Sequence, residues 1–311
     1  MQDPGTSPSA NKARRAAGRL SERSGSGPAV LDANRDEQEQ VLEDDKVRAA
    51  FEATVEEGYR RLHRTWPGMV ATGMVGGIDV AMGVFGILLV ETFTGNKLLA
   101  GLAFSIGFIS LTLAKSELFT ENFLVPVAAA VARKTGPLPV LRLWGTTATA
   151  NLMGGWVMMG IVLLALPEFG KAAVEVGNHF PSVGIGWQSF FSAVLGGALI
   201  TLMTWMERGT DSIPGKLAAA VVAGFLLASA GLFHAIVLSI DMFAALHAGA
   251  PFGYLDWFEL FLFASFANIL GGIGFVTILR LAQVGWRRIE RERVAAEAGK
   301  TPEEHHSEDP V

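Results

Sequence analysis

Long apolar stretches alternate with short polar connections through the middle of the chain, while charged residues collect toward its two ends. Six such stretches stand at residues 68–92, 98–133, 138–166, 187–206, 215–247 and 256–282. Each is long enough to cross a hydrocarbon core about 30 Å thick as a helix, which takes roughly 20 residues. The pattern predicts an all-α integral membrane protein with six transmembrane helices.

The second and fifth stretches are too long for one straight spanning helix, since about 35 residues at ~1.5 Å each overshoot the bilayer. Both carry polar residues near their middle: residues 115–122 read KSELFTEN, and residues 229–234 read SAGLFH. Each is therefore predicted to form two half-helices joined by a short loop at membrane depth. Such a loop is tolerated only where it is buried in protein or lines a cavity.

Three further segments flank this transmembrane domain, which is expected at residues 67–283. Residues 1–40 are rich in small, polar and charged residues and are predicted to be a disordered tail. Residues 41–66 place Val47, Phe51, Val55, Tyr59 and Leu62 at helical spacing, which predicts an amphipathic helix. That helix either lies in the membrane interface or leads to the membrane as a soluble helix. Residues 284–311 form a second charged tail.

Charge indicates how the protein is oriented in the membrane, and composition gives no reason to expect a nucleic-acid partner or a thiolate site. In a six-span arrangement one side holds most basic residues: Arg60, Arg61, Arg64, Arg133, Lys134, Arg142, Arg208, Lys216, Arg280, Arg287 and Arg288, against Lys97 and Lys171 on the other. The positive-inside rule then makes both termini cytoplasmic. The net charge of −5 gives no reason to expect nucleic acid. With no cysteine there is no thiolate site, and neither a metal nor a cofactor is expected.

Short motifs recur in the same order in the two halves of the chain. They pair Gly76-Gly77 with Gly196-Gly197, Leu118-Phe119-Thr120 with Leu232-Phe233-His234, and Asn151 to Gly155 with Asn268 to Gly272. Because each half has three spans, the second copy enters from the opposite side and the repeat is inverted. Interrupted helices in inverted repeats indicate a transport pathway near the midplane. Thr120 and His234 are therefore candidate pore residues, and Asn151 and Asn268 are expected to tie the loops by hydrogen bonds.

Several motifs together match one family. They are Glu117-Leu118-Phe119-Thr120, Gly231-Leu232-Phe233-His234, the Asn-x-x-Gly elements at Asn151 and Asn268, Trp205-Met206, and Lys216 at the opening of the fifth stretch. By these residues the chain resembles the formate/nitrite transporter family over nearly all of residues 60–285. The resemblance implies an aquaporin-like six-helix protomer in a homopentamer, with one pore per protomer. It also implies hydrophobic constrictions at Phe104, Phe108, Leu118 and Leu227, with Phe119 in the adjoining loop motif.

The chain departs from the family pattern at several positions. Phe233 replaces the Glu that commonly precedes the histidine, Leu238 and Gly197 replace Asn, Glu121 replaces Gly, and the extracellular Lys has only His179 as a loose neighbour. Lys115 and Glu121 instead suggest a divergent branch, similar to inner-membrane members of unassigned substrate. The expected location is thus the bacterial inner (plasma) membrane, and the fold carries over better than the substrate.

The predicted function is passage of a small monovalent anion such as formate or nitrite, with or without a proton, and not an enzyme reaction. An anion in a narrow apolar pore pays a desolvation cost of several kcal/mol. His234 can offset that cost by donating a hydrogen bond, or can pass a proton to the anion; its alternative role is a structural hydrogen bond between helices. The Thr120 hydroxyl either orients the imidazole or caps the following half-helix.

Four charged residues within the spans, Asp79, Lys115, Glu121 and Asp241, are further functional candidates. Lys115 is expected to pair with Glu121 or Asp79 and hold the loop shut, the alternative being a place on the route of the anion. Lys216 either gathers anions at the cytoplasmic mouth or anchors the helix at the interface.

Three other functions compete with anion transport as interpretations of the sequence. An intramembrane serine protease using Ser229 and His234 is disfavoured because residues five apart across a helix break do not readily reach hydrogen-bonding geometry. A channel for neutral solutes such as water or glycerol lacks the Asn-Pro-Ala pair and leaves the histidine unexplained. A membrane sensor or scaffold whose pore is closed remains an alternative function.

Overall fold

The structure is a computed structural model that describes residues 46–133, 135–285 and 294. Ala49–Val311 form one compact unit, and Met1–Arg48 form a second, of which only residues 46–48 are described. The predicted tail at 1–40 lies outside the described residues, as does nearly all of the tail at 284–311. Every regular element within the described ranges is a helix.

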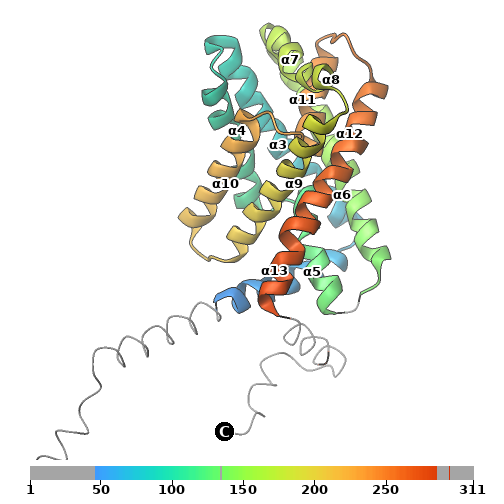
Figure 1. Ribbon diagram of the computed structural model, residues 1–311. Coiled ribbons are helices and arrows are strands. Elements are labelled where there is room, and N and C mark those ends of the chain that lie inside the picture. The colour runs from blue at the N-terminus through green and yellow to red at the C-terminus, as the bar shows by residue number, and fades with distance from the viewer. Residues whose placement is uncertain (1–45, 134, 286–293, 295–311) are drawn as a thin grey trace, which may run out of the picture. The chain divides into compact units, whose positions relative to one another are not determined.

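Five helices in the described part of the chain are long and apolar enough to cross a membrane. They are α3 (Trp66–Thr94), α4 (Lys97–Ala114), α6 (Pro137–Ala165), α9 (Trp187–Arg208), and α12 (Tyr254–Ile269), which continues through the π-helix η3 (Leu270–Thr277) into α13 (Ile278–Val284). Four of them coincide with predicted stretches, and α4 covers the first half of the second predicted stretch. The prediction of an all-helical membrane protein is therefore confirmed (Figure 1).

The second stretch is interrupted in its polar run. Helix α4 ends at Ala114, and Lys115 closes it with a left-handed backbone (φ 54°). A short 3-10 helix, η1 (Phe119–Phe123), follows, and α5 (Val125–Ala132) then begins with Pro126 in its first turn, where a missing N–H costs nothing. The break therefore separates α4 from α5 by ten residues that do not form α-helix.

The fifth stretch is interrupted at its own polar run. Helix α10 (Ile213–Ser229) ends before Gly231, whose φ of 58° suits a residue without a side chain. Helix α11 (Ala235–His247) begins directly after His234. Neither half is long enough to cross a membrane alone, and together the two shorter apolar helices cover the fifth predicted stretch.

Close helix packing in the bundle depends on paired glycines. Helix α3 packs on α4 and α6, α9 packs on α10, α12 and η3, and α11 packs on α6 and α7. A Cβ on Gly77 would lie 2.0 Å from the carbonyl oxygen of Asn151, and one on Gly197 would lie 2.1 Å from that of Asn268. Any side chain at these glycines would force the backbones apart. The glycines thus set the contact of α3 with α6 and of α9 with α12.

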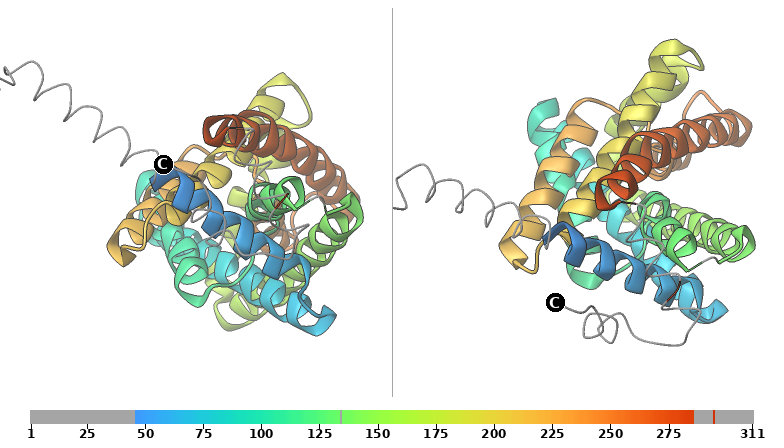
Figure 2. Two further views of the ribbon diagram at one scale, coloured as in Figure 1. Left: turned by 90° about the horizontal axis from the view of Figure 1, so that it is seen from below. Right: turned by 60° about the horizontal axis from the view of Figure 1, so that its bottom comes forward.

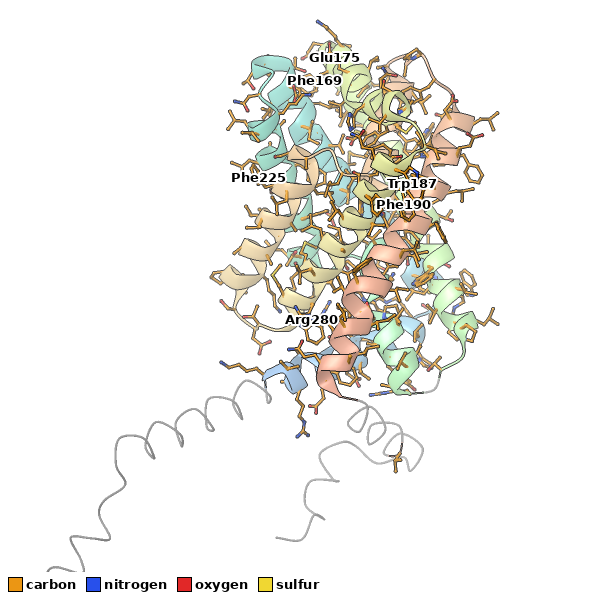
Figure 3. All side chains as sticks on the ribbon, viewed as in Figure 1. Phe169, Glu175, Trp187, Phe190, Phe225 and Arg280 are labelled. Atoms are coloured by element: carbon orange, nitrogen blue, oxygen red, sulfur yellow. The ribbon has the colours of Figure 1, made fainter. Side chains whose placement is uncertain are left out.

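The two ends of the bundle differ in their covering elements. Between α6 and α9 the chain forms η2 (Pro167–Phe169), α7 (Gly170–Gly177) and α8 (His179–Val183) at one end (Figure 1). Residues 49–62 and α5 lie at the opposite end, and Figure 2 shows this helix lying across it. Figure 3 places Glu175 at the α7 end and Arg280 near the other.

The amphipathic segment is helical over residues 46–62 and packs on protein. Phe51, Val55 and Leu62 are buried, whereas Tyr59 is 38% exposed and lies beneath the guanidinium of Arg133. A Cβ on Gly58 would lie 2.2 Å from the Val125 carbonyl oxygen. The sequence left an interfacial helix or a soluble leader open, but the apolar face contacts the start of α5.

Candidate functional site at the helix interruptions

The two interruptions bring Thr120 and His234 into contact. The Thr120 Oγ1 lies 2.7 Å from the His234 Nε2, and both residues are completely buried. Thr120 belongs to η1, and His234 is the N-cap residue of α11. Residues 114 positions apart in the sequence therefore form one polar contact inside the bundle.

The other ring nitrogen of His234 fixes the direction of this hydrogen bond. The Nδ1 accepts the backbone N–H of Val237 at 3.3 Å. A neutral imidazole that accepts at Nδ1 carries its proton on Nε2, so the Nε2–H donates to the Thr120 hydroxyl oxygen. The hydroxyl hydrogen then points elsewhere and can be donated to a bound group. Thr120 does not cap α5, whose N-cap is Leu124.

Asn151 holds the first loop with three hydrogen bonds. Its Oδ1 accepts the N–H of Phe119 at 2.8 Å, and its Nδ2 donates to the carbonyls of Gly73 at 2.7 Å and Glu117 at 2.8 Å. The side chain is completely buried. One amide therefore satisfies backbone groups that the broken helix would leave unpaired.

Asn268 holds the second loop with the same set of bonds. Its Oδ1 accepts the N–H of Ala235 at 2.9 Å, and its Nδ2 donates to the carbonyls of Ala193 at 2.6 Å and Phe233 at 2.9 Å. It too is completely buried. The two halves therefore fix their loops by equivalent contacts.

These bonds correct the register of the motif comparison. Matching them pairs Glu117 with Phe233 and Leu118 with His234. The alignment of Leu118-Phe119-Thr120 with Leu232-Phe233-His234 is therefore wrong by two residues. Thr120 and His234 touch in space but occupy different places in their loops. At the position equivalent to the histidine, the first half carries an apolar leucine.

The residues expected to form constrictions are buried apolar side chains. Phe104 and Phe108 pack edge to face on α4 with ring centroids 5.1 Å apart, and neither is exposed. Leu118, Phe119 and Leu227 are also buried and join them in one hydrophobic cluster. Water is therefore excluded from these five side chains.

Lys115 does not hold the loop shut, and that prediction is wrong. Its side chain is exposed, and no ion pair among the described residues joins it to Glu121 or Asp79. Asp79 instead accepts the hydroxyls of Ser110 at 2.6 Å and Ser116 at 2.5 Å. The prediction rested on proximity in the sequence. Lys115 itself ends α4 in a left-handed conformation, and its side chain is exposed.

The partners of the loop carboxylates are two arginines, Arg61 in the 46–62 helix and Arg64 just after it. Arg61 lies 3.5 Å from a carboxylate oxygen of Glu121 and 3.5 Å from one of Glu117, and it donates to the Asn122 side chain at 2.9 Å. Arg64 donates to Glu117 at 2.5 Å. The sequence analysis counted these arginines only as positive-inside charges. Arg61 lies on the helical face of Ala50 and Thr54, which are also buried, and not on the face of Phe51, Val55 and Leu62, so the apolar spacing gave no signal for it.

Arg61 and Glu57 form an ion pair in the same helix, with a distance of 2.9 Å from Nε to Oε1. Burial by itself would lower the pKa of Arg61, but Glu117, Glu121 and Glu57 raise it above its ordinary value. Burial would likewise raise the pKa of Glu57, yet the guanidinium of Arg61 brings it below its ordinary value. Both groups are therefore charged at neutral pH.

Two other side chains that the sequence did not single out hold η1. The indole Nε1 of Trp144 donates to the Asn122 carbonyl at 2.8 Å, and the Thr277 hydroxyl donates to the Phe123 carbonyl at 3.0 Å. A tryptophan or threonine within an apolar stretch gives no signal that separates such a role from ordinary packing. The loop around Thr120 is thus fixed from three helices.

The remaining candidates lie toward the two ends. Asp241 is 4% exposed, and within the described residues its Oδ1 has no hydrogen-bond partner. Lys216 is half-buried near the start of α10. His179, the loose neighbour of the missing extracellular lysine, lies beside the second loop, since a Cβ on Gly231 would be 3.1 Å from its Nε2.

The chain matches the formate/nitrite transporter family over residues 48–282 and belongs to that family. This confirms the resemblance drawn from the loop motifs and the prediction of a membrane transporter rather than an enzyme. Among curated relatives, inner membrane protein YfdC of Escherichia coli K12 is 26% identical over 256 residues, covering 77% of this chain and 79% of its own. Formate channel BtFdhC of Bacillus thuringiensis is 27% identical over 265 residues, covering 74% and 92%.

Solved structures of the same family share the fold. A structure described as an FNT family ion channel superposes with a TM-score of 0.66 at 16% identity, covering 77% of this chain and 98% of its own. A pentameric formate channel with formate bound superposes with a TM-score of 0.59 at 21% identity, covering 70% and 97%. The described helices therefore adopt the fold of these channels.

Proposed function

We propose that this protein passes small monovalent anions of the formate/nitrite class across the membrane, past the contact of Thr120 with His234. That contact is the observation that carries the proposal, because it is a polar pair at the meeting point of two interrupted helices in a family of transporters. A relative at 27% identity is named a formate channel, which supports the substrate class.

The pair supplies what an anion needs where it is least hydrated. In the tautomer set by Val237, the imidazole donates to Thr120, and the hydroxyl hydrogen of Thr120 is available to an anion oxygen. The N-terminus of α11 begins at Ala235, so the positive end of that half-helix adds to the favourable field. Each contribution offsets part of the desolvation cost.

Apolar side chains form the barrier to water and hydrated cations in the pathway. Phe104, Phe108, Leu118 and Leu227, with Phe119 beside them, are assigned to constrictions that exclude water and hydrated cations. Lys216, half-buried near the start of α10, is assigned to attract anions at the cytoplasmic mouth.

The wider architecture follows the family. We assign six spans in two inverted repeats, with α4 to α5 and α10 to α11 as the broken second and fifth spans, in an aquaporin-like protomer. The equivalent hydrogen bonds of Asn151 and Asn268 support this repeat. One neighbouring structure is a pentamer, which supports a homopentamer in the bilayer. The transmembrane domain spans 67–283, and both termini are cytoplasmic.

The test is uptake of formate and nitrite into liposomes containing the purified protein, across a range of pH. Wild type is expected to take up these anions, and His234→Ala is expected to lose most of that uptake. The matched control is His247→Ala on the same helix, where the ring contacts the Trp156 carbonyl, and it should keep wild-type uptake.

Each other outcome changes the assignment. Folded wild type that takes up no small anion would overturn the proposal and favour a closed sensor or scaffold. Uptake of glycerol or water in place of anions would favour a neutral-solute channel. Anion uptake that survives His234→Ala would place the pathway away from the two loops.

A further inference from the structure

The 46–62 helix buries a positive charge against the first loop. Arg61 is only 3% exposed and contacts Glu57, Glu117, Glu121 and Asn122. An arginine that serves only to orient a membrane protein needs no burial, since it acts from the aqueous side of the membrane. The burial of Arg61 therefore calls for a specific partner.

Its partners are the two carboxylates that bracket the loop. Glu117 and Glu121 are 1% and 3% exposed, and the three residues between them include Thr120. Arg64 also contacts Glu117, but its side chain is 23% exposed and so more strongly screened by water. Arg61 is the buried cation in contact with both carboxylates.

The surrounding charges do not replace it. Glu207 and Arg208 at the end of α9 carry opposite charges, and within the described residues neither forms an ion pair with Arg61, Glu117 or Glu121. The Oε2 of Glu117 has no hydrogen-bond partner among the described residues. Without Arg61, the loop would hold two buried carboxylates with Arg64 as the one remaining contact.

We propose that Arg61 determines charge selectivity in the transport pathway because, together with Arg64, it balances the charges of Glu117 and Glu121 on either side of the Thr120 loop. Rings of uncompensated carboxylates make cation-selective pores, and an anion near them is repelled most strongly where water is absent. The 46–62 helix then forms part of the electrostatic wall of the pathway. This inference rests on the proposed anion transport.

A purely structural alternative is that Arg61 only fastens the helix to α5 and the loop. The two roles differ in what a second substitution does. If charge balance matters, removing one carboxylate should compensate for the loss of the guanidinium. If anchoring matters, it should not, because Glu121→Gln does not restore the contacts of Arg61 with Glu57, Glu117 and Asn122.

The experiment compares formate uptake into liposomes by wild type, Arg61→Gln and the double variant Arg61→Gln/Glu121→Gln. Arg61→Gln is expected to reduce uptake by about tenfold or more, given the strength of unscreened charges a few ångströms apart. The double variant is expected to return to within about threefold of wild type. The matched control is Arg60→Gln, whose side chain is 68% exposed and pairs with Glu57, and which should leave uptake unchanged.

A second measurement reports the charge selectivity of the pathway directly. In planar bilayers under a sodium formate gradient, the reversal potential of Arg61→Gln is expected to shift toward that of a cation-selective pore, and the double variant should shift it back. Unchanged uptake and reversal potential in folded Arg61→Gln would overturn the inference. So would a double variant that stays inactive although it melts at the wild-type temperature.

Two further outcomes are separable. If Arg61→Gln does not fold, Glu117→Gln/Glu121→Gln keeps the guanidinium and is expected to raise uptake at low formate concentration; lower uptake would count against the inference. Wild type without any anion uptake would instead overturn the proposed function itself.

Discussion

The Thr120 hydroxyl and the His234 imidazole act as one polar unit within buried surroundings. Neither can be hydrated, since both are completely buried. Each therefore depends on the other for a hydrogen bond, and the cost of leaving a buried donor unpaired is about 1–3 kcal/mol. A substitution at either member changes both the stability of the loop contact and the chemistry offered to an anion.

Thr120→Val tests this unit with a side chain of similar shape and no hydroxyl. It should reduce formate uptake strongly and destabilise the protein by about 1–3 kcal/mol, because the Nε2–H of His234 loses its acceptor. Liposome uptake and thermal melting in detergent would measure the two effects. Thr120→Ser keeps the hydroxyl and should retain most of both properties. Wild-type uptake by Thr120→Val would show that the hydroxyl has no part in transport.

Single residues also decide how much of the site the sequence could predict. The contact of Thr120 with His234 was predicted because each residue stands in a polar interruption of an apolar stretch. Lys115 was misassigned because sequence adjacency to Glu121 says nothing about the left-handed turn between α4 and η1. The motif register was wrong by two residues because shared Leu-Phe letters were aligned, whereas the structure follows the hydrogen bonds of Asn151 and Asn268.

At the scale of elements, the 46–62 helix behaves as part of the bundle. Leu62 shares a buried apolar cluster with Ala129 of α5, and Gly58 allows contact with the Val125 backbone. Sequence periodicity predicted the helix from its apolar positions, and because it counted only these it gave no signal for the contacts of Arg61 and Gly58. A buried arginine is recognised only when its carboxylate partners, more than fifty residues away, are placed in space.

The docking of this helix should depend on pH through Glu57. Its pKa is below the ordinary value of 4.5, so its ion pair with Arg61 stabilises the folded state above that pH and is lost as the pH falls through the lowered pKa. Wild type should therefore melt at a higher temperature than Glu57→Gln at about pH 7, and the difference should shrink below about pH 4.5.

Glu56→Gln is the control for that comparison. Its carboxylate is 71% exposed and pairs with Arg133 at 2.9 Å, and an exposed pair is worth about 0–1 kcal/mol. It should therefore change the melting temperature little at any pH. A difference between wild type and Glu57→Gln that grows as the pH falls would contradict the assignment of Glu57 as a stabilising charge.

At the scale of the whole molecule, the apolar pattern predicts most of the helices but not which helices contact one another. Helix length and polarity suffice to predict the positions of α3, α6, α9 and α12, because each must bury its backbone polar groups internally to cross the bilayer. They do not reveal that Trp144 and Thr277, from different helices, fasten the same loop. Such contacts depend on which helices are neighbours, and a hydropathy pattern does not contain that information.

The orientation of the molecule can be tested with single cysteines, because the chain has none of its own. Glu175 in α7 and Asp211 between α9 and α10 are both exposed, and they lie on opposite sides of the six-span arrangement. Arg208 and Lys216 flank Asp211, so the positive-inside rule places it in the cytoplasm. Glu175→Cys should then react with a membrane-impermeant maleimide on intact cells, whereas Asp211→Cys should react only after the membrane is opened. Wild type, which has no cysteine, serves as the blank. If Asp211→Cys alone reacts on intact cells, the assigned orientation is reversed. The 46–62 helix and the charge balance around Arg61 would then lie at the outer mouth of the pathway.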